Sequence, residues 1–188
     1  MRQWIRILCV FTFLALLTLP VIPAAAQSGL MADLLKDVSE VESKLVGLAK
    51  AMPEATYSWA PGEGVRSVGG VFQHVAADNY LLPALLGVAP PAATGIKAAE
   101  YPTVQAYETR KVDRATVIAD LEASFAHLKK AMMDTPDAKL GEKVKFFGQE
   151  QTIQQVWVLT TTHLHEHLGQ SIAYARSNGV VPPWSRGG

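Results

Sequence analysis

Cysteine is nearly absent from this sequence, which contains a single one, Cys9, among its 188 residues. Cys9 lies in an N-terminal segment that we expect to be removed, so the mature chain would hold neither a thiol nor a disulfide. That absence excludes cysteine nucleophiles and thiolate metal ligands, and it fits an oxidising compartment. Any transition-metal site must therefore be built from histidine and carboxylate side chains.

An excess of charge of either sign is also lacking, because 17 basic residues face 17 acidic ones. Removal of residues 1–26 takes away Arg2 and Arg6 but no acid, which leaves 15 basic and 17 acidic residues and a net charge of −2. No lysine-rich run or basic patch remains. We therefore expect no nucleic-acid partner.

The longest apolar run is confined to the N-terminus. Arg2 and Arg6 precede an apolar stretch at residues 7–19, and three alanines at residues 24–26 provide a small-residue cleavage site before Gln27. This order is typical of a secretory signal peptide, and the apolar stretch is short for a membrane span. We expect a signal peptide at residues 1–26, one domain at residues 27–188, and an exported protein, periplasmic or extracellular, without membrane attachment after cleavage. An uncleaved N-terminal anchor is the alternative.

Period-two alternation is scarce, and helical periodicity dominates. Apolar residues three and four apart predict helices over residues 28–52, over 67–86 with Ser67 as N-cap, and over about 103–133, where Asp113 is a possible restart after a kink. A long connection at residues 87–102 separates the second and third helices. A short extended piece at residues 144–148 precedes a fourth helix that Thr152 opens. The prediction is an all-α four-helix bundle with a long crossover.

Three of the five histidines lie in the last predicted helix. On a helix, His163 and His167 project from one face with Cβ atoms about 5–6 Å apart, and His165 is turned away. The same residues fit H-x-H-x-H, which on a strand would place all three on one face, and residues 156–162 are rich in β-formers. The helical period after His167 and the expected C-cap at Gly179 favour the helix.

A second polar break lies in the second predicted helix. His74 and Asp78 are one turn apart on a stripe that is otherwise apolar. A lone histidine in such a place is usually a core or surface residue, and exposure is the commoner fate of an acid such as Asp78. His127, beside two lysines on the third helix, is expected at the surface.

Two segments resemble a known family. W-A-P-G-E-G-V-R-S-V-G-G-V-F-Q-H at residues 59–74 and H-L-H-E-H-L-G-Q-S-I-A-Y-A-R-S-N-G-V-V-P-P at residues 163–183 are similar to the second and last helices of DinB-like (YfiT-like) four-helix-bundle proteins. The resemblance extends over nearly all of the mature chain. It implies a metal site formed by His74, His163 and His167. Leu168 is a departure, because many members have arginine there.

The resemblance implies metal-dependent chemistry, since members of the family transfer small thiols, isomerise small acids or hydrolyse substrates. Three histidines leave a coordination position open to water or substrate, and a divalent ion, zinc or nickel by its acceptance of imidazole, would acidify that water. Asp78 is the candidate catalytic residue, as an acceptor for an imidazole N–H or as a base, whereas Glu166 is expected to point away from the triad. We expect a hydrolase or transferase acting on a small molecule. The alternatives are a non-catalytic metal-binding or stress-related protein and a homodimer with a structural metal.

Overall fold

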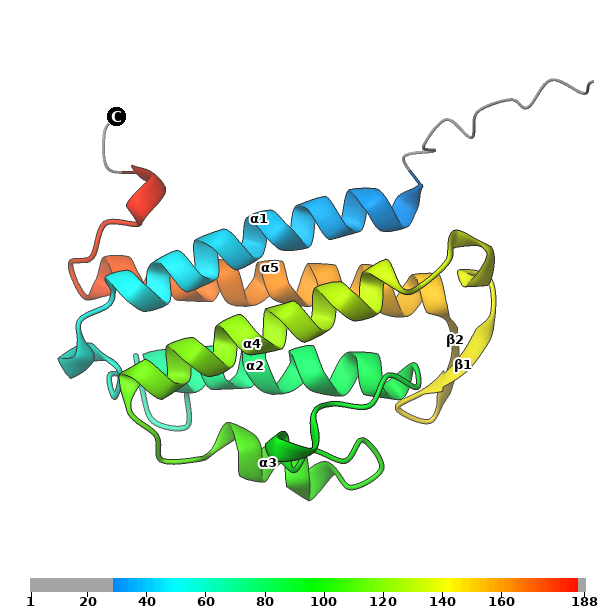
Figure 1. The fold of residues 1–188 in the computed structure, drawn as a ribbon. Coiled ribbons are helices and arrows are strands. Elements are labelled where there is room, and N and C mark those ends of the chain that lie inside the picture. Colours follow the sequence, from blue (N-terminus) through cyan, green and yellow to red (C-terminus); the bar gives the residue numbers. More distant parts are fainter. Residues whose placement is uncertain (1–28, 186–188) are drawn as a thin grey trace, which may run out of the picture.

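The computed structural model describes residues 29–185, so the predicted signal peptide lies outside the described residues. Four long helices lie side by side in a bundle (Figure 1). They are α1 (Leu30–Ala51), α2 (Val68–Leu85), α4 (Arg114–Met133) and α5 (Ile153–Ser177). A shorter helix, α3 (Tyr101–Glu108), lies outside the bundle in the chain segment that joins α2 to α4. The predicted all-α four-helix bundle with a long crossover is confirmed.

The core lies between the four long helices. Both α1 and α2 contact α4 and α5. Each helix contributes apolar residues three or four positions apart, as expected of an amphipathic helix; among the most deeply buried side chains are Val38, Val41, Leu45, Leu48, Phe72, Leu121, Phe125, Leu128, Trp157 and Leu164. No helix within residues 29–185 has the length and apolar character that crossing a membrane would require.

Helix α2 is buried on nearly all sides. Its N-cap is Ser67, as predicted, whose side chain accepts a hydrogen bond of 3.1 Å from the backbone N–H of Gly70. The glycine at position 69 permits a close approach, because a Cβ there would meet the backbone oxygen of Tyr57 at 3.2 Å. The start of α2, less than two turns before His74, is thereby fixed against the loop that follows α1.

The prediction of a single helix over residues 103–133 is wrong. The structure has two helices, α3 and α4, with a break between Glu108 and Arg114. Asp113 opens α4, since its side chain accepts a 2.7 Å hydrogen bond from the N–H of Thr116, so the restart at this residue is confirmed. The break arises because Val104 of α3 joins a separate apolar cluster against α2, whereas α4 faces the main core.

The extended piece predicted at residues 144–148 is part of a hairpin formed by β1 (Lys143–Phe146) and β2 (Gln149–Thr152). Phe146 pairs with Gln149, so the turn consists of Phe147 and Gly148, which have φ angles of 47° and 80°. Two positive φ angles are the mark of a type I′ turn. The hairpin leads directly into α5, whose N-cap is Thr152 as predicted.

Candidate metal centre

The bundle brings together the three histidines that the sequence singled out. His74 comes from α2, and His163 and His167 come from α5, the helix beside it. The ring centroids lie 4.4 Å apart for His163 and His167, 4.6 Å for His74 and His167, and 5.5 Å for His74 and His163. One nitrogen from each ring can be chosen so that all three lie within 4.8 Å of one another.

The helical interpretation of the last segment is confirmed, and the strand interpretation is wrong. His163 and His167 are one turn apart on α5, and their Nε2 atoms are 3.2 Å apart. Two ligand atoms bound to one ion at about 2.0–2.1 Å in tetrahedral geometry are about 3.3 Å apart. The separation of the two Nε2 atoms therefore suits binding of one ion by both rings. His165 faces elsewhere, with its Nε2 2.8 Å from Oδ2 of Asp37 on α1.

The outer nitrogen of two of the three rings is hydrogen-bonded to an acceptor. Nδ1 of His74 is 3.2 Å from Oε2 of Glu108, and Nδ1 of His167 is 2.9 Å from Oε1 of Gln170. Nδ1 of His163 is 3.5 Å from Oε2 of Glu166. Acceptors at Nδ1 of His74 and His167 favour the tautomer that carries its proton there, which leaves the Nε2 lone pairs of these two rings free for a metal ion.

Glu108 is a residue of this candidate site that the sequence did not reveal. It ends α3, and its carboxylate also accepts a hydrogen bond from Nε of Arg66. Burial would raise the pKa of Glu108, but the hydrogen bonds from His74 and Arg66 outweigh it and lower the pKa from 4.5 to about 2. The carboxylate is therefore ionised at neutral pH and can only accept a hydrogen bond from Nδ1–H of His74. No local pattern marks Glu108, because 34 residues separate it from His74.

Two other predictions about charged side chains need correction. Glu166 was expected to point away from the triad, yet the i, i+3 spacing brings its carboxylate to the outer side of His163 while most of the side chain stays in solvent.

His127 was expected at the surface. It is half-buried against the ring of Tyr80, 5.3 Å between centroids, and burial lowers its pKa.

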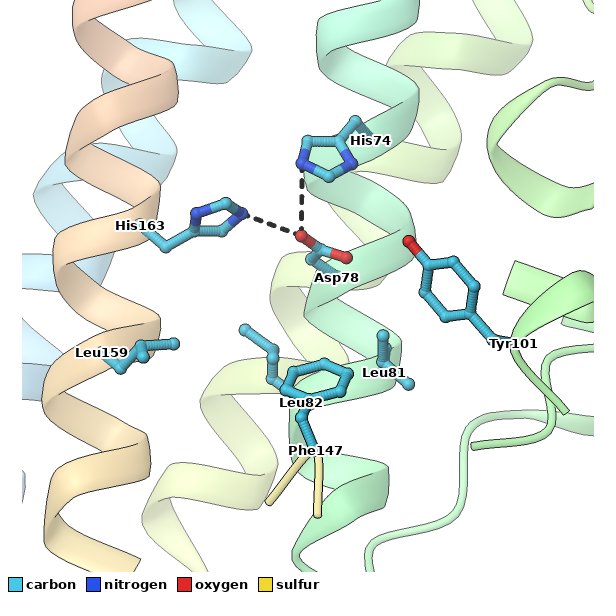
Figure 2. A pocket seen from close by; sticks show the side chains of 8 residues that line it. All are labelled: His74, Asp78, Leu81, Leu82, Tyr101, Phe147, Leu159 and His163. Carbon is cyan, nitrogen blue, oxygen red and sulfur yellow. Dashed lines mark hydrogen bonds and ion pairs between the residues drawn. The ribbon is translucent and has the colours of Figure 1, made fainter. Parts of the chain in front are cut away.

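Asp78 lies on the inner side of the histidine cluster and is largely buried (Figure 2). Its Oδ2 atom is 2.8 Å from Nε2 of His163 and 3.3 Å from Nε2 of His74. The hydrogen bond to Asp78 raises the pKa of His163, against the lowering effect of burial. Burial is the main reason that the pKa of His167 is lowered. Asp78 is therefore not exposed, and its carboxylate lies beside Nε2 atoms rather than beside the outer Nδ1 atoms.

The residues fit a divalent metal ion. The three imidazoles can each direct one nitrogen toward a common point, and the rings of His74 and His167 are held from behind by hydrogen-bond acceptors. Such outer hydrogen bonds orient ligands and raise their basicity. An all-nitrogen set suits zinc, nickel and other first-row ions rather than magnesium or calcium. Asp78 adds a negative charge beside the point where the ion would lie.

A pocket of about 370 Å³ opens beside the cluster. Figure 2 shows its residues, which come from α2, α3, the hairpin and α5; they are His74, Asp78, Leu81, Leu82, Tyr101, Phe147, Leu159 and His163. Its volume lies within the usual range of small-molecule sites, about 300–1,000 Å³. The candidate metal centre is therefore at one wall of a pocket that a small molecule can enter.

Comparisons with known proteins point to one family. The family model of the DinB superfamily matches residues 38–171. A DinB-like protein from Bacillus cereus shares the fold with a TM-score of 0.66 at 15% identity, over 81% of this chain and 95% of that one. YfiT from Bacillus subtilis, described as a probable metal-dependent hydrolase with an unusual four-helix bundle topology, gives a TM-score of 0.62 at 14% identity, over 80% and 89%. No curated protein matches.

Proposed function

Because this chain belongs to the DinB superfamily, we propose that it is a metal-dependent hydrolase of small molecules. His74, His163 and His167 hold a divalent ion, zinc or nickel, through their Nε2 atoms. The observation that carries the proposal is the convergence of three imidazole nitrogens, two of them from residues that line a pocket, His74 and His163. A similar bundle in YfiT, described as a probable metal-dependent hydrolase, supports the reaction type.

The ion would supply Lewis acidity, which lowers the pKa of a coordinated water molecule to about 7. The protein contributes the remaining functions. Oδ2 of Asp78 is 2.8 Å from Nε2 of His163 and 3.3 Å from Nε2 of His74, so Asp78 is placed to accept a proton from a water molecule beside these nitrogens and later return it to a leaving group. Glu108 and Gln170 hold the Nδ1 protons of His74 and His167 and thus keep the two rings in one orientation.

A structural metal site is the alternative. The buried position of His167 between helices favours it, whereas the pocket at His74 and His163 favours catalysis. The two readings differ in stability, because an ion that binds only the folded state stabilises it. Export of the mature chain, starting at Gln27, is part of the proposal on the basis of the signal sequence.

The test begins with metal content, measured on purified protein and on two alanine variants. His74→Ala is expected to lose the bound ion. His165→Ala is the matched control, because His165 is an exposed histidine between His163 and His167 in the sequence, and this variant is expected to retain the ion. Turnover of esters and amides is then measured with the metal-loaded and the chelated protein. Asp78→Asn should keep the ion and lose at least about 100-fold in kcat.

Two results would contradict the proposal. Retention of metal by His74→Ala would place the ion elsewhere. Equal turnover by the metal-loaded and chelated proteins would show that the reaction does not depend on the site. A large loss of thermal stability on chelation, without turnover of any substrate, would favour the structural reading.

A further inference from the structure

The pocket beside the histidine cluster has a polar end and an apolar end. His74, His163 and Asp78 form the polar end, and Leu81, Leu82 and Leu159 line the rest (Figure 2). Leu159 is one turn before His163 on α5 and is 39% exposed. A ligand that binds a metal ion with its head would therefore place its body against leucine side chains.

Positive charge is lacking in this pocket. Among the described residues that line it, none is lysine or arginine, and Asp78 contributes a carboxylate. Nearby Arg66 is bound to Glu108, on the outer side of His74. A substrate with several carboxylates would find no partner for them beyond the ion and would be repelled by Asp78. The pocket thus disfavours multiply anionic substrates, such as small peptidic thiols.

Phe147 at the pocket mouth is the most unusual of the lining residues. It occupies the first central position of the hairpin turn with a φ of 47°, a left-handed conformation that favours asparagine or glycine over a bulky residue. Burial does not offset this conformational cost, because the side chain of Phe147 is 60% exposed. Its ring contacts that of Phe146 edge-to-face. Residues held in such conformations are concentrated at ligand sites.

The hairpin is anchored where Phe147 can act on the pocket. The side chain of Phe146 is buried with Leu82 of α2 and Val156 of α5. Leu82 also lines the pocket, as does Phe147, and both are labelled in Figure 2. Tyr101 of α3, 51% exposed, supplies a second aromatic ring on another side. The mouth is therefore framed by two exposed aromatic rings from elements outside the four-helix bundle.

We propose that the pocket takes a compact substrate with one polar, metal-binding head and an uncharged apolar body, such as a short-chain acyl ester or amide, and that Phe147 covers the apolar body. This inference rests on the proposed function, because the head is assigned to the metal centre. The inference goes beyond the proposed function by naming the substrate class and a specificity-determining residue, Phe147.

The experiment measures the affinity of the zinc-loaded protein for linear alkyl hydroxamates of two to six carbons by titration calorimetry. Hydroxamates bind zinc through their head, and the tail reports on the pocket without any turnover. Affinity is expected to rise by about two- to fourfold per methylene, the upper figure corresponding to about 0.8 kcal/mol for a fully buried group. Less than a twofold rise over the whole series would overturn the inference.

Phe147→Asn tests the assigned residue, because asparagine suits the turn. The variant should keep its zinc and melt at the same or a higher temperature, yet bind the six-carbon hydroxamate about fivefold to tenfold more weakly and the two-carbon one unchanged. Met133→Ala removes another exposed apolar side chain, one that does not line the pocket, and should change neither affinity. Unchanged six-carbon binding by Phe147→Asn would overturn the role of Phe147.

Leu159→Lys tests the charge argument. It should weaken binding of the six-carbon hydroxamate and strengthen binding of succinic monohydroxamate, which carries a second, anionic group. Tighter binding of the anionic probe than of the apolar ones by the unaltered protein would overturn the substrate class.

The two proposals fail separately. A clear chain-length dependence of hydroxamate binding without hydrolysis of any ester would refute the hydrolase and leave the pocket assignment standing. Hydrolysis of esters without preference for chain length would support the hydrolase and refute the pocket assignment. If the protein binds no zinc, nickel or other divalent ion, both proposals fail.

Discussion

Two faces of helix α5 carry histidines in different surroundings. His163 and His167 face α2, where a third imidazole, a carboxylate and a pocket meet them. His165, between them in sequence, faces α1 and forms an exposed pair with Asp37. Histidine content therefore does not define the site. The neighbouring helix on each side of α5 decides which imidazoles can share one ion.

The largest expected effect separates the two faces directly. His163→Ala should reduce zinc affinity by at least about 100-fold, because a chelate with two ligands replaces one with three. His165→Ala should leave the affinity within about twofold. Competition with a chromophoric chelator measures both variants. Equal losses in the two variants would show that the faces do not differ as described.

A second comparison concerns the apolar residues of α5. Leu164 is fully enclosed in the main core, so Leu164→Ala should lower the free energy of unfolding by about 2–5 kcal/mol. Leu159→Ala, in the pocket wall, should lower it by less than about 1 kcal/mol, because its side chain already contacts solvent. Urea denaturation gives both values. A cost for Leu159→Ala as large as that for Leu164→Ala would mean that the wall is part of the core.

The outer acceptors provide a third, smaller contrast. Glu108→Gln should weaken zinc binding by about 10- to 100-fold, since an ionised acceptor behind His74 is replaced by a neutral amide. Glu166→Gln should have little effect, because that carboxylate is 3.5 Å from His163 and mostly in solvent. Chelator competition again provides the measurement. A stronger effect at Glu166 than at Glu108 would reverse the assignment.

The smallest effect is expected from pH in the metal-free protein. The pKa of His163 is raised, above all by its hydrogen bond to Asp78, so the pair stabilises the fold fully below the unfolded value of about 6.5 and less as the pH rises through the folded pKa. Asp78→Asn should therefore lower the free energy of unfolding more at about pH 5.5 than at about pH 9. Asp37→Asn, at the exposed pair, should change it by less than about 0.5 kcal/mol. Urea denaturation in the presence of a chelator measures both; a pH-independent effect of Asp78→Asn would contradict the pairing.

Much of the fold was readable from the sequence because it depends on short-range chemistry. The N-caps Ser67, Asp113 and Thr152 mark helix starts through hydrogen bonds to residues three positions away. The break between α3 and α4 was missed because apolar spacing alone does not reveal which neighbour a helix packs against. The hairpin was missed in part because its turn contains phenylalanine at a position that asparagine normally occupies.

The sequence by itself determined the pair His163 and His167, since a helical period of 3.6 residues fixes which side chains are neighbours one turn apart. It also determined the metal chemistry available, because without thiols only imidazoles and carboxylates remain. The family resemblance implied that His74 joins this pair, and the tertiary structure places it there. Tertiary structure alone decided that Glu108 holds His74 and that Phe147 borders the pocket. These contacts join residues far apart in the chain, and their distances depend on how helices pack rather than on any local repeat.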